Sequence, residues 1–137
     1  MTGSPDPKVH TAEALVERIF EASLNTFDIF AIYVGDRLGY YSTLDEHGPL
    51  TSHQLADRAG THERYTREWL EQQAVTGILT ADTAGTGSPA FSIPAAHAEV
   101  LTDELSLSYI APLARMISVA GFKLPNIVDA HRQGGGV

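Results

Sequence analysis

A long stretch of helical periodicity near the start of the chain limits the folds open to it. Apolar or small residues recur in steps of three or four, at positions 12, 16, 19, 23, 27, 30, 34, 38 and 41. This spacing is typical of a helix. Thr11 is a suitable N-cap, and Gly39 predicts a break. A second apolar set lies off this stripe: Leu15, Phe20, Leu24, Ile29 and Tyr33. The helix is therefore apolar on more than one face.

One small domain cannot cover so many faces of a single helix. Two interpretations follow, a central core helix or a helix shared between two subunits, and we favour the second. Large apolar side chains left in water are costly, and two-fold dimers are the commonest assembly. We therefore expect a homodimer built on this helix, with the interface residues Phe20, Phe27, Phe30 and Val34.

The middle of the chain has the element order of a winged helix-turn-helix. A short helix is expected at about 40–46, followed by helices in 50–60 and 61–76 around the turn residue Gly60. Thr51 or Ser52 is the expected cap of the first of these two helices, and Thr61 of the second. Two strands are expected at 78–80 and 90–93, on either side of a turn rich in Gly and Ser.

The last third of the chain is expected to be helical again. Pro94 precedes one helix, a second is expected over 105–122, and a short one over 124–133. The predicted fold class is mainly α, a winged helix-turn-helix with a long N-terminal helix, a small β-hairpin wing and C-terminal helices. The expected organisation is a flexible start (1–10), N-terminal dimerisation helices (11–49), the winged-helix unit (50–93), C-terminal helices (94–133) and a linker (134–137).

The charge balance argues against nucleic acid as a partner. The chain has 9 Lys and Arg against 17 Asp and Glu, a formal net charge of −8. DNA binding depends largely on basic residues that neutralise phosphates. The second helix of the unit carries two basic and three acidic residues: Arg64, Arg67, Glu63, Glu68 and Glu71. Arg64 and Arg67 are expected to pair with Glu68 and Glu71 at helical spacing. We therefore expect the unit not to bind DNA.

No pattern of catalytic or metal-binding residues stands out. The chain has no cysteine, and no two of its 6 histidines are spaced i and i+4. The run from Gly85 to Ser88 is expected to be a hairpin turn rather than a phosphate loop. No signal peptide and no apolar run long enough for a membrane span is seen, so we expect a cytoplasmic protein.

The segment LTSHQLADRAGTHERYTREWLEQQAVTGIL (50–79) resembles the bacterial class I methyltransferases that have an N-terminal winged-helix region. The family pattern ER-x-x-REWLEQQA-x-x-GIL is matched from Glu63 to Leu79. Further similarity lies in FSIPAAHAEVLTDE (91–104), YIAPLAR (109–115) and LPNIVDAHRQGGGV (124–137). The resemblance implies a region that dimerises and covers the substrate, followed by a Rossmann-like domain that binds S-adenosylmethionine.

The Gly-rich cofactor loop of that second domain has no counterpart in these 137 residues. We therefore expect 134–137 to be a truncated linker to a missing methyltransferase domain, with no catalytic, cofactor-binding or metal-binding residue in this chain. S-adenosylmethionine is expected as the cofactor of the full-length parent, and a small molecule as its methyl acceptor. The candidate substrate wall is Tyr109, Leu113, Met116 and Phe122. The alternative is a standalone winged-helix transcriptional regulator or ligand-binding protein.

Overall fold

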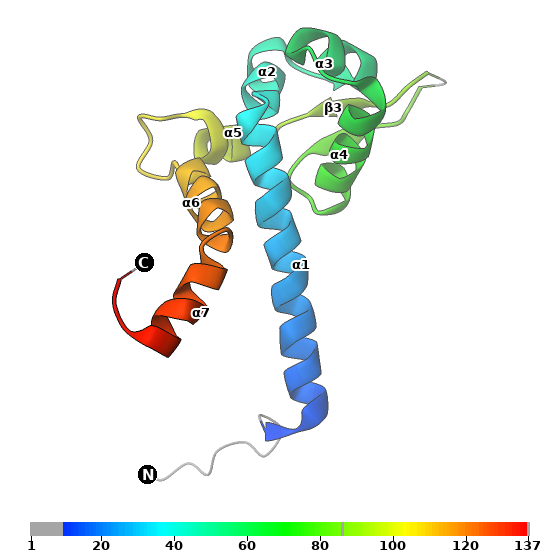
Figure 1. Cartoon of the computed structure of the whole chain (residues 1–137). Helices are drawn as coiled ribbons and strands as arrows, with labels where there is room; N and C mark the ends of the chain where they lie inside the picture. The colour runs from blue at the N-terminus through cyan, green and yellow to red at the C-terminus, as the bar shows by residue number, and fades with distance from the viewer. Residues whose placement is uncertain (1–9, 86, 137) are drawn as a thin grey trace.

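Helix α1 (Ala12–Arg37) is the longest element of the computed structural model, which describes residues 10–85 and 87–136. The Thr11 hydroxyl caps α1 by accepting a hydrogen bond from the Ala14 amide at 3.1 Å. Gly39 adopts a positive φ of 69° and separates α1 from α2 (Tyr40–His47). The expected cap and break are both confirmed. Figure 1 shows α1 projecting from a head formed by the middle of the chain. The expectations for residues 1–9 and 137 lie outside the described residues.

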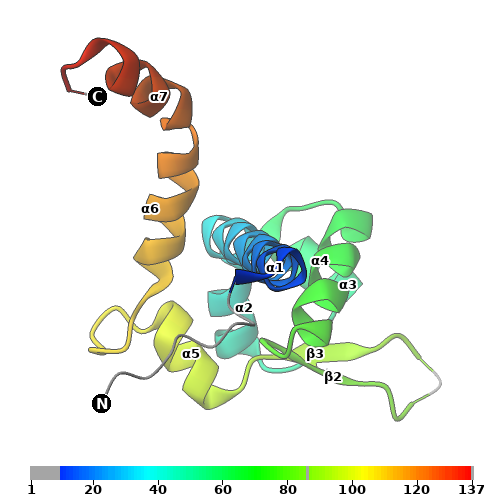
Figure 2. The same cartoon turned by 90° about the horizontal axis from the view of Figure 1, so that it is seen from below.

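The head is a winged helix-turn-helix, as expected. After α2 come β1 (Leu50–Thr51), α3 (Ser52–Ala59), α4 (Glu63–Val75), β2 (Thr80–Asp82) and β3 (Ala90–Ser92). The strands form an antiparallel sheet in the order β1-β3-β2, with Phe91 opposite both Leu50 and Ala81. Figure 2 shows β2 and β3 running out together beyond α3 and α4 as the wing.

The head differs from the sequence-based expectations in three local features. Thr61 does not cap α4, because its hydroxyl bonds to Tyr40 and Thr66, each at 2.9 Å, and His62 takes the N-cap position. Strand β2 begins at 80 rather than 78, because the amides of residues 78 and 79 bond to the Gln73 carbonyl at the end of α4. The two-residue strand β1 was missed, because so short an edge strand leaves no alternating pattern.

Three helices complete the chain: α5 (Ala95–Thr102), α6 (Ala111–Gly121) and α7 (Leu124–Gln133). Helix α6 begins six residues later than expected, because Asp103 and Ser106 accept backbone hydrogen bonds that form turns before it. Helix α6 packs along α1, whereas α7 has no buried residue. Figures 1 and 2 both show α6 and α7 as an arm whose far end leads away from α1.

The hydrophobic core lies in the head. Its fully buried side chains come from α2, α3, α4 and the segment after α4: Tyr40, Tyr41, Leu44, Leu55, Leu70 and Leu79. The Tyr41 hydroxyl donates a hydrogen bond to Gln73 Oε1, and both side chains are buried. Burial, with the carboxylates of α1 nearby, raises the pKa of Tyr41 above its ordinary value. The tyrosine therefore stays neutral and acts as a donor inside the core.

Helix α1 meets the head at its C-terminal half. Gly35 is the buried residue of α1, and a Cβ there would lie 2.2 Å from Trp69 Cζ2. The indole Nε1 of Trp69 donates to the Ala31 carbonyl at 2.9 Å, and Gln72 Nε2 donates to Asp28 Oδ1 at 3.0 Å. These contacts all lie between positions 28 and 35. The part of α1 before Asp28 therefore has no such support from the head.

We predict that Gly35→Ala destabilises the fold by about 2 kcal/mol, because the added methyl overpacks the contact with Trp69. Urea denaturation measures the loss. Gly121→Ala in α6 is the matched control, because a Cβ there meets no atom within 4 Å and alanine favours a helix. Equal stability of the two variants would contradict the close approach of α1 to Trp69.

Candidate functional site

The surface that stands out is an apolar stripe along α1. Phe20 is 65% exposed and Phe27 is 66% exposed, and Phe30 and Val34 are each 42% exposed. The rings of Phe27 and Phe30 pack edge to face at a centroid distance of 6.3 Å without burying either ring. We define the α1 stripe as the exposed apolar residues of this helix: Leu15, Val16, Ile19, Phe20, Leu24, Phe27, Phe30 and Val34. The four residues expected at a dimer interface all belong to it.

A groove of about 490 Å³ lies between α1 and the arm. Its lining is mostly apolar: Phe30, Tyr33, Val34, Ser118, Gly121, Phe122 and Leu124. A volume of this size lies within the range of small-molecule sites. The groove brings Phe30 and Val34, expected at the dimer interface, together with Phe122, expected in the substrate wall.

The other expected wall residues do not join Phe122 in the groove. Tyr109 lines a separate, more polar pocket of about 170 Å³ beside Asp36 and Arg115. Leu113 and Met116 lie on α6 and are exposed. Because helix 105–122 begins only at Ala111, Tyr109 lies before the helix and not on the same face as Met116. The structure divides these four residues among different surfaces. Their role as a substrate wall remains a prediction.

One ion pair joins the arm to α1. Arg115 Nε and Nη2 donate to the two carboxylate oxygens of Asp36 at 2.5 and 2.8 Å, and the Asp36 side chain is only 7% exposed. A carboxylate in the last turn of a helix is disfavoured by the helix dipole, so Asp36 depends on this cation. The hydrogen bond to Asp36 raises the pKa of the Arg115 guanidinium. Sequence analysis missed this pair, because the partners are 79 residues apart.

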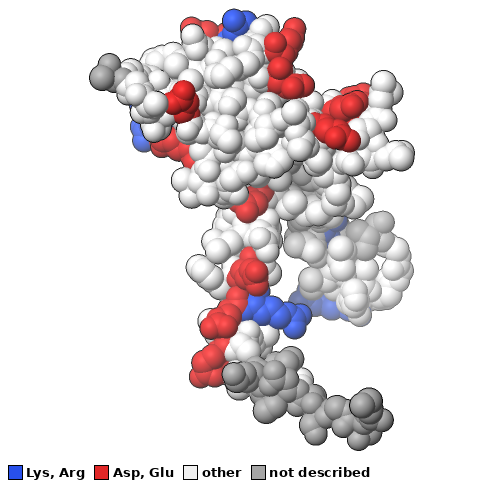
Figure 3. Space-filling view, turned by 180° about the vertical axis from the view of Figure 1, so that it is seen from behind, with Lys and Arg blue, Asp and Glu red and all other residues white. Residues whose placement is uncertain are grey.

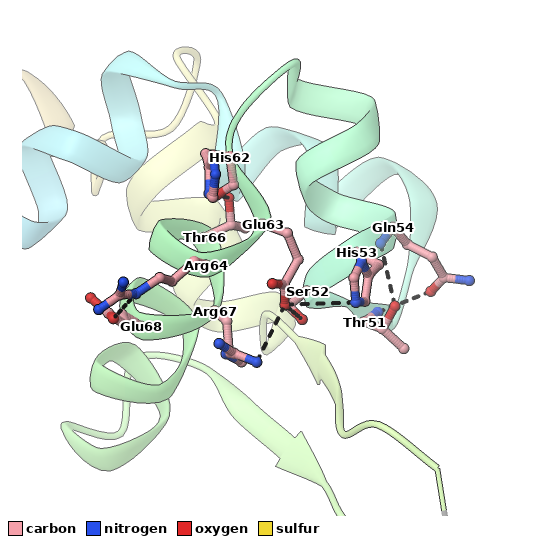
Figure 4. Close-up of polar contacts among 10 residues, drawn as sticks. All are labelled: Thr51, Ser52, His53, Gln54, His62, Glu63, Arg64, Thr66, Arg67 and Glu68. Atoms are coloured by element: carbon pink, nitrogen blue, oxygen red, sulfur yellow. Dashed lines mark hydrogen bonds and ion pairs between the residues drawn. The ribbon is translucent and has the colours of Figure 1, made fainter.

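The arginines of α4 pair with acidic side chains of the same helix (Figure 4). Arg64 Nε lies 3.2 Å from Glu68 Oε1, as expected, whereas the ion pair of Arg67 is with Glu63, at 3.9 Å, and not with the expected Glu71. Glu63 also accepts a hydrogen bond from Ser52 at 2.8 Å, and this bond lowers the pKa of Glu63. Both arginines of α4 are therefore paired with carboxylates of their own helix.

Neither a metal site nor a membrane span is found among the described residues. Within residues 10–85 and 87–136, no group of three or more His, Asp or Glu side chains is placed to hold a metal ion. None of the helices in this part of the chain combines the length and apolar character needed to cross a bilayer.

A family model described as the Rv2258c-like winged HTH domain matches residues 29–103. These residues run from the part of α1 held by the head to the end of α5. No curated protein gives a significant sequence match.

Solved structures of methyltransferases share the fold. The human N-acetylserotonin methyltransferase, solved in complex with SAM, is 17% identical, has a TM-score of 0.73, and is matched over 100% of this chain and 38% of its own. The mitomycin 7-O-methyltransferase MmcR is 29% identical, with a TM-score of 0.59 over 75% of this chain and 29% of its own. The SAM-dependent methyltransferase SibL is 22% identical, with a TM-score of 0.55 over 90% of this chain and 34% of its own. The chain thus spans between 29% and 38% of the length of these enzymes. The resemblance to methyltransferases is confirmed at the level of the fold.

We predict that Arg115→Met costs about 1–2 kcal/mol, because it leaves the nearly buried Asp36 carboxylate without its partner. Arg132→Met is the matched control, because the Arg132–Asp129 pair is exposed and contributes little. Thermal denaturation of both variants gives the comparison. A loss at Arg115 no larger than at Arg132 would show that the ion pair does not hold the arm.

We predict no sequence-specific binding of duplex DNA at submicromolar concentration and near-physiological salt, measured by gel shift against random competitor DNA. Changing Glu63, Glu68 and Glu71 together to Gln releases Arg64 and Arg67, so this variant should bind DNA more strongly than the wild type. Tight binding of one sequence by the wild type would overturn the interpretation.

Proposed function

Because the chain belongs to the family of Rv2258c-like winged HTH domains, we propose that it is the dimerisation and substrate-covering region of a small-molecule methyltransferase. The parent enzyme would use S-adenosylmethionine, and this region would not catalyse the transfer by itself. The solved methyltransferases that share its fold support this assignment over a transcriptional regulator. The 29% identity to MmcR carries more weight than the other matches, which concern the fold alone.

The observation that carries the dimerisation role is the α1 stripe. Three of its members are phenylalanines, and an aromatic side chain buries about 150–250 Å² when it is covered. At about 25 cal/mol per Å², covering the exposed parts of three such rings on each chain of a symmetric dimer is worth on the order of 10–20 kcal/mol, before the entropic cost of association is subtracted. A second copy of the chain supplies the same stripe, so a two-fold arrangement covers both at once.

The charge distribution supports a winged helix that does not act on DNA. Acidic side chains are scattered over the face of the head seen in Figure 3, with basic groups at its margins. The net charge of −8 repels a polyanion, and Arg64 and Arg67 are paired within α4. We infer that the helix-turn-helix serves here as a packing platform for α1.

The groove between α1 and the arm supports the substrate-covering role. It is concave and mainly apolar, and Phe122, at the turn between α6 and α7, forms part of its wall. Leu113 and Met116 present further exposed apolar surface on α6, outside the groove. In this proposal the groove and the exposed face of α6 shield the methyl acceptor from water, while cofactor and catalytic groups belong to the rest of the parent enzyme.

We predict a homodimer at micromolar concentration, with a mass near twice the 14.8 kDa of one chain. Phe27→Asp should give a monomer, because it places a charge in the centre of the α1 stripe. Val75→Asp is the matched control: Val75 is 87% exposed on α4, and its replacement should leave the dimer intact. Size-exclusion chromatography with light scattering measures all three masses.

A monomeric wild type would refute the dimer. A Phe27→Asp variant that remains fully dimeric would place the interface away from α1.

A further inference from the structure

Two exposed apolar surfaces of this chain carry opposite charges. The first is the distal half of α1, residues 12–27, where the α1 stripe is accompanied by Glu13, Glu17 and Glu21. Against Arg18, the only basic residue of that segment, these three carboxylates give a net charge of −2. Figure 3 shows acidic side chains along the projecting part of this helix.

The second surface is α7. Leu124, Ile127 and Val128 are spaced by three and four residues, so they share one face of the helix, and all three are exposed. Lys123 and Arg132 accompany this face, and against Asp129 they give residues 123–133 a net charge of +1 with His131 neutral. In a chain with a net charge of −8, this is a locally basic segment.

The two surfaces do not meet within one chain. The Asp36–Arg115 pair holds α6 near the C-terminal end of α1, the end farthest from the distal half. Figures 1 and 2 agree that α7 then leads away from α1. Neither distal α1 nor α7 has a buried residue, so both apolar faces lie open.

We propose that α7 of one copy packs on the distal half of α1 of a second copy, and that the reverse contact forms across the two-fold axis. This inference rests on the proposed homodimer and specifies its interface. Burial of Phe20, Phe27 and their neighbours against Leu124, Ile127 and Val128 would supply the affinity. The glutamates of α1 and the basic residues of α7 would fix the pairing and register, since peripheral charges act on specificity more than on affinity.

Charge reversal tests this pairing. Glu13→Lys/Glu17→Lys changes the net charge of residues 12–27 from −2 to +2, which opposes the +1 of residues 123–133. Lys123→Glu/Arg132→Glu changes the net charge of residues 123–133 from +1 to −3, which opposes the −2 of residues 12–27. Each pair of changes should weaken the dimer about tenfold or more, because two symmetric contacts turn repulsive. The chain with all four changes should recover to within about threefold of the wild type. Sedimentation velocity over a concentration series at low salt gives the dissociation constants, with Glu68→Lys on α4 as a control of equal sign.

Cross-linking tests the contact directly. The chain has no cysteine, so Glu17→Cys and Arg132→Cys each introduce a single reactive thiol. Mixing the two variants with a short bis-maleimide should give a cross-linked pair of chains, whereas Glu68→Cys mixed with Arg132→Cys should not.

The results of these experiments distinguish the proposed α1–α7 contact from the proposed homodimer itself. A wild type that is dimeric but shows neither rescue nor the cross-link contradicts the α1–α7 contact and leaves the proposed dimer standing. A wild type that is monomeric at all concentrations overturns both.

Discussion

The close approach of Gly35 to Trp69 sets the position of the longest helix on the head. A side chain at position 35 would collide with the indole ring, so α1 can cross α4 at this distance only with glycine at that position. The neighbouring residue, Asp36, holds Arg115 of α6. Two consecutive residues therefore fix α1 to the winged helix on one side and to the C-terminal arm on the other.

The two halves of α1 differ in the contacts that stabilise them. The half from Asp28 onwards is held by the indole of Trp69 and the amide of Gln72. The half before Asp28 leaves Phe20 and Phe27 largely exposed and has no residue buried by the part of the chain that the structure describes. Isolated helices are marginal in water, so an extended helix with such a surface is best explained by a partner that covers it. We propose that the winged helix holds α1 in position for this partner and does not bind nucleic acid.

Local signals in the sequence were sufficient for most of the helices. Thr11 caps α1, Gly39 ends it, and Thr51 and Gln54 form a capping box at α3. Each of these depends on residues within four positions of one another, which is the range over which sequence patterns are informative. The exposed aromatic face of α1 was also correctly anticipated, because three phenylalanines exceed what one small head can cover.

Features that depend on distant residues could not be predicted in this way. Thr61 precedes a helix and was expected to cap it. Its hydroxyl instead forms hydrogen bonds with Tyr40, 21 residues earlier, and with Thr66. The Asp36–Arg115 pair and the groove between α1 and the arm arise only when α6 is placed beside α1. The groove in turn joins residues that had been expected to serve two separate roles, Phe30 at an interface and Phe122 in a substrate wall.

The central claim is that the head stabilises one half of α1 and a second copy of the chain stabilises the other. Amide hydrogen exchange along α1, measured at several protein concentrations, tests this most directly. The account predicts that amides of residues 30–37 are protected at every concentration, whereas those of residues 15–27 gain protection as the concentration rises. Equal and concentration-independent exchange in the two halves would contradict it.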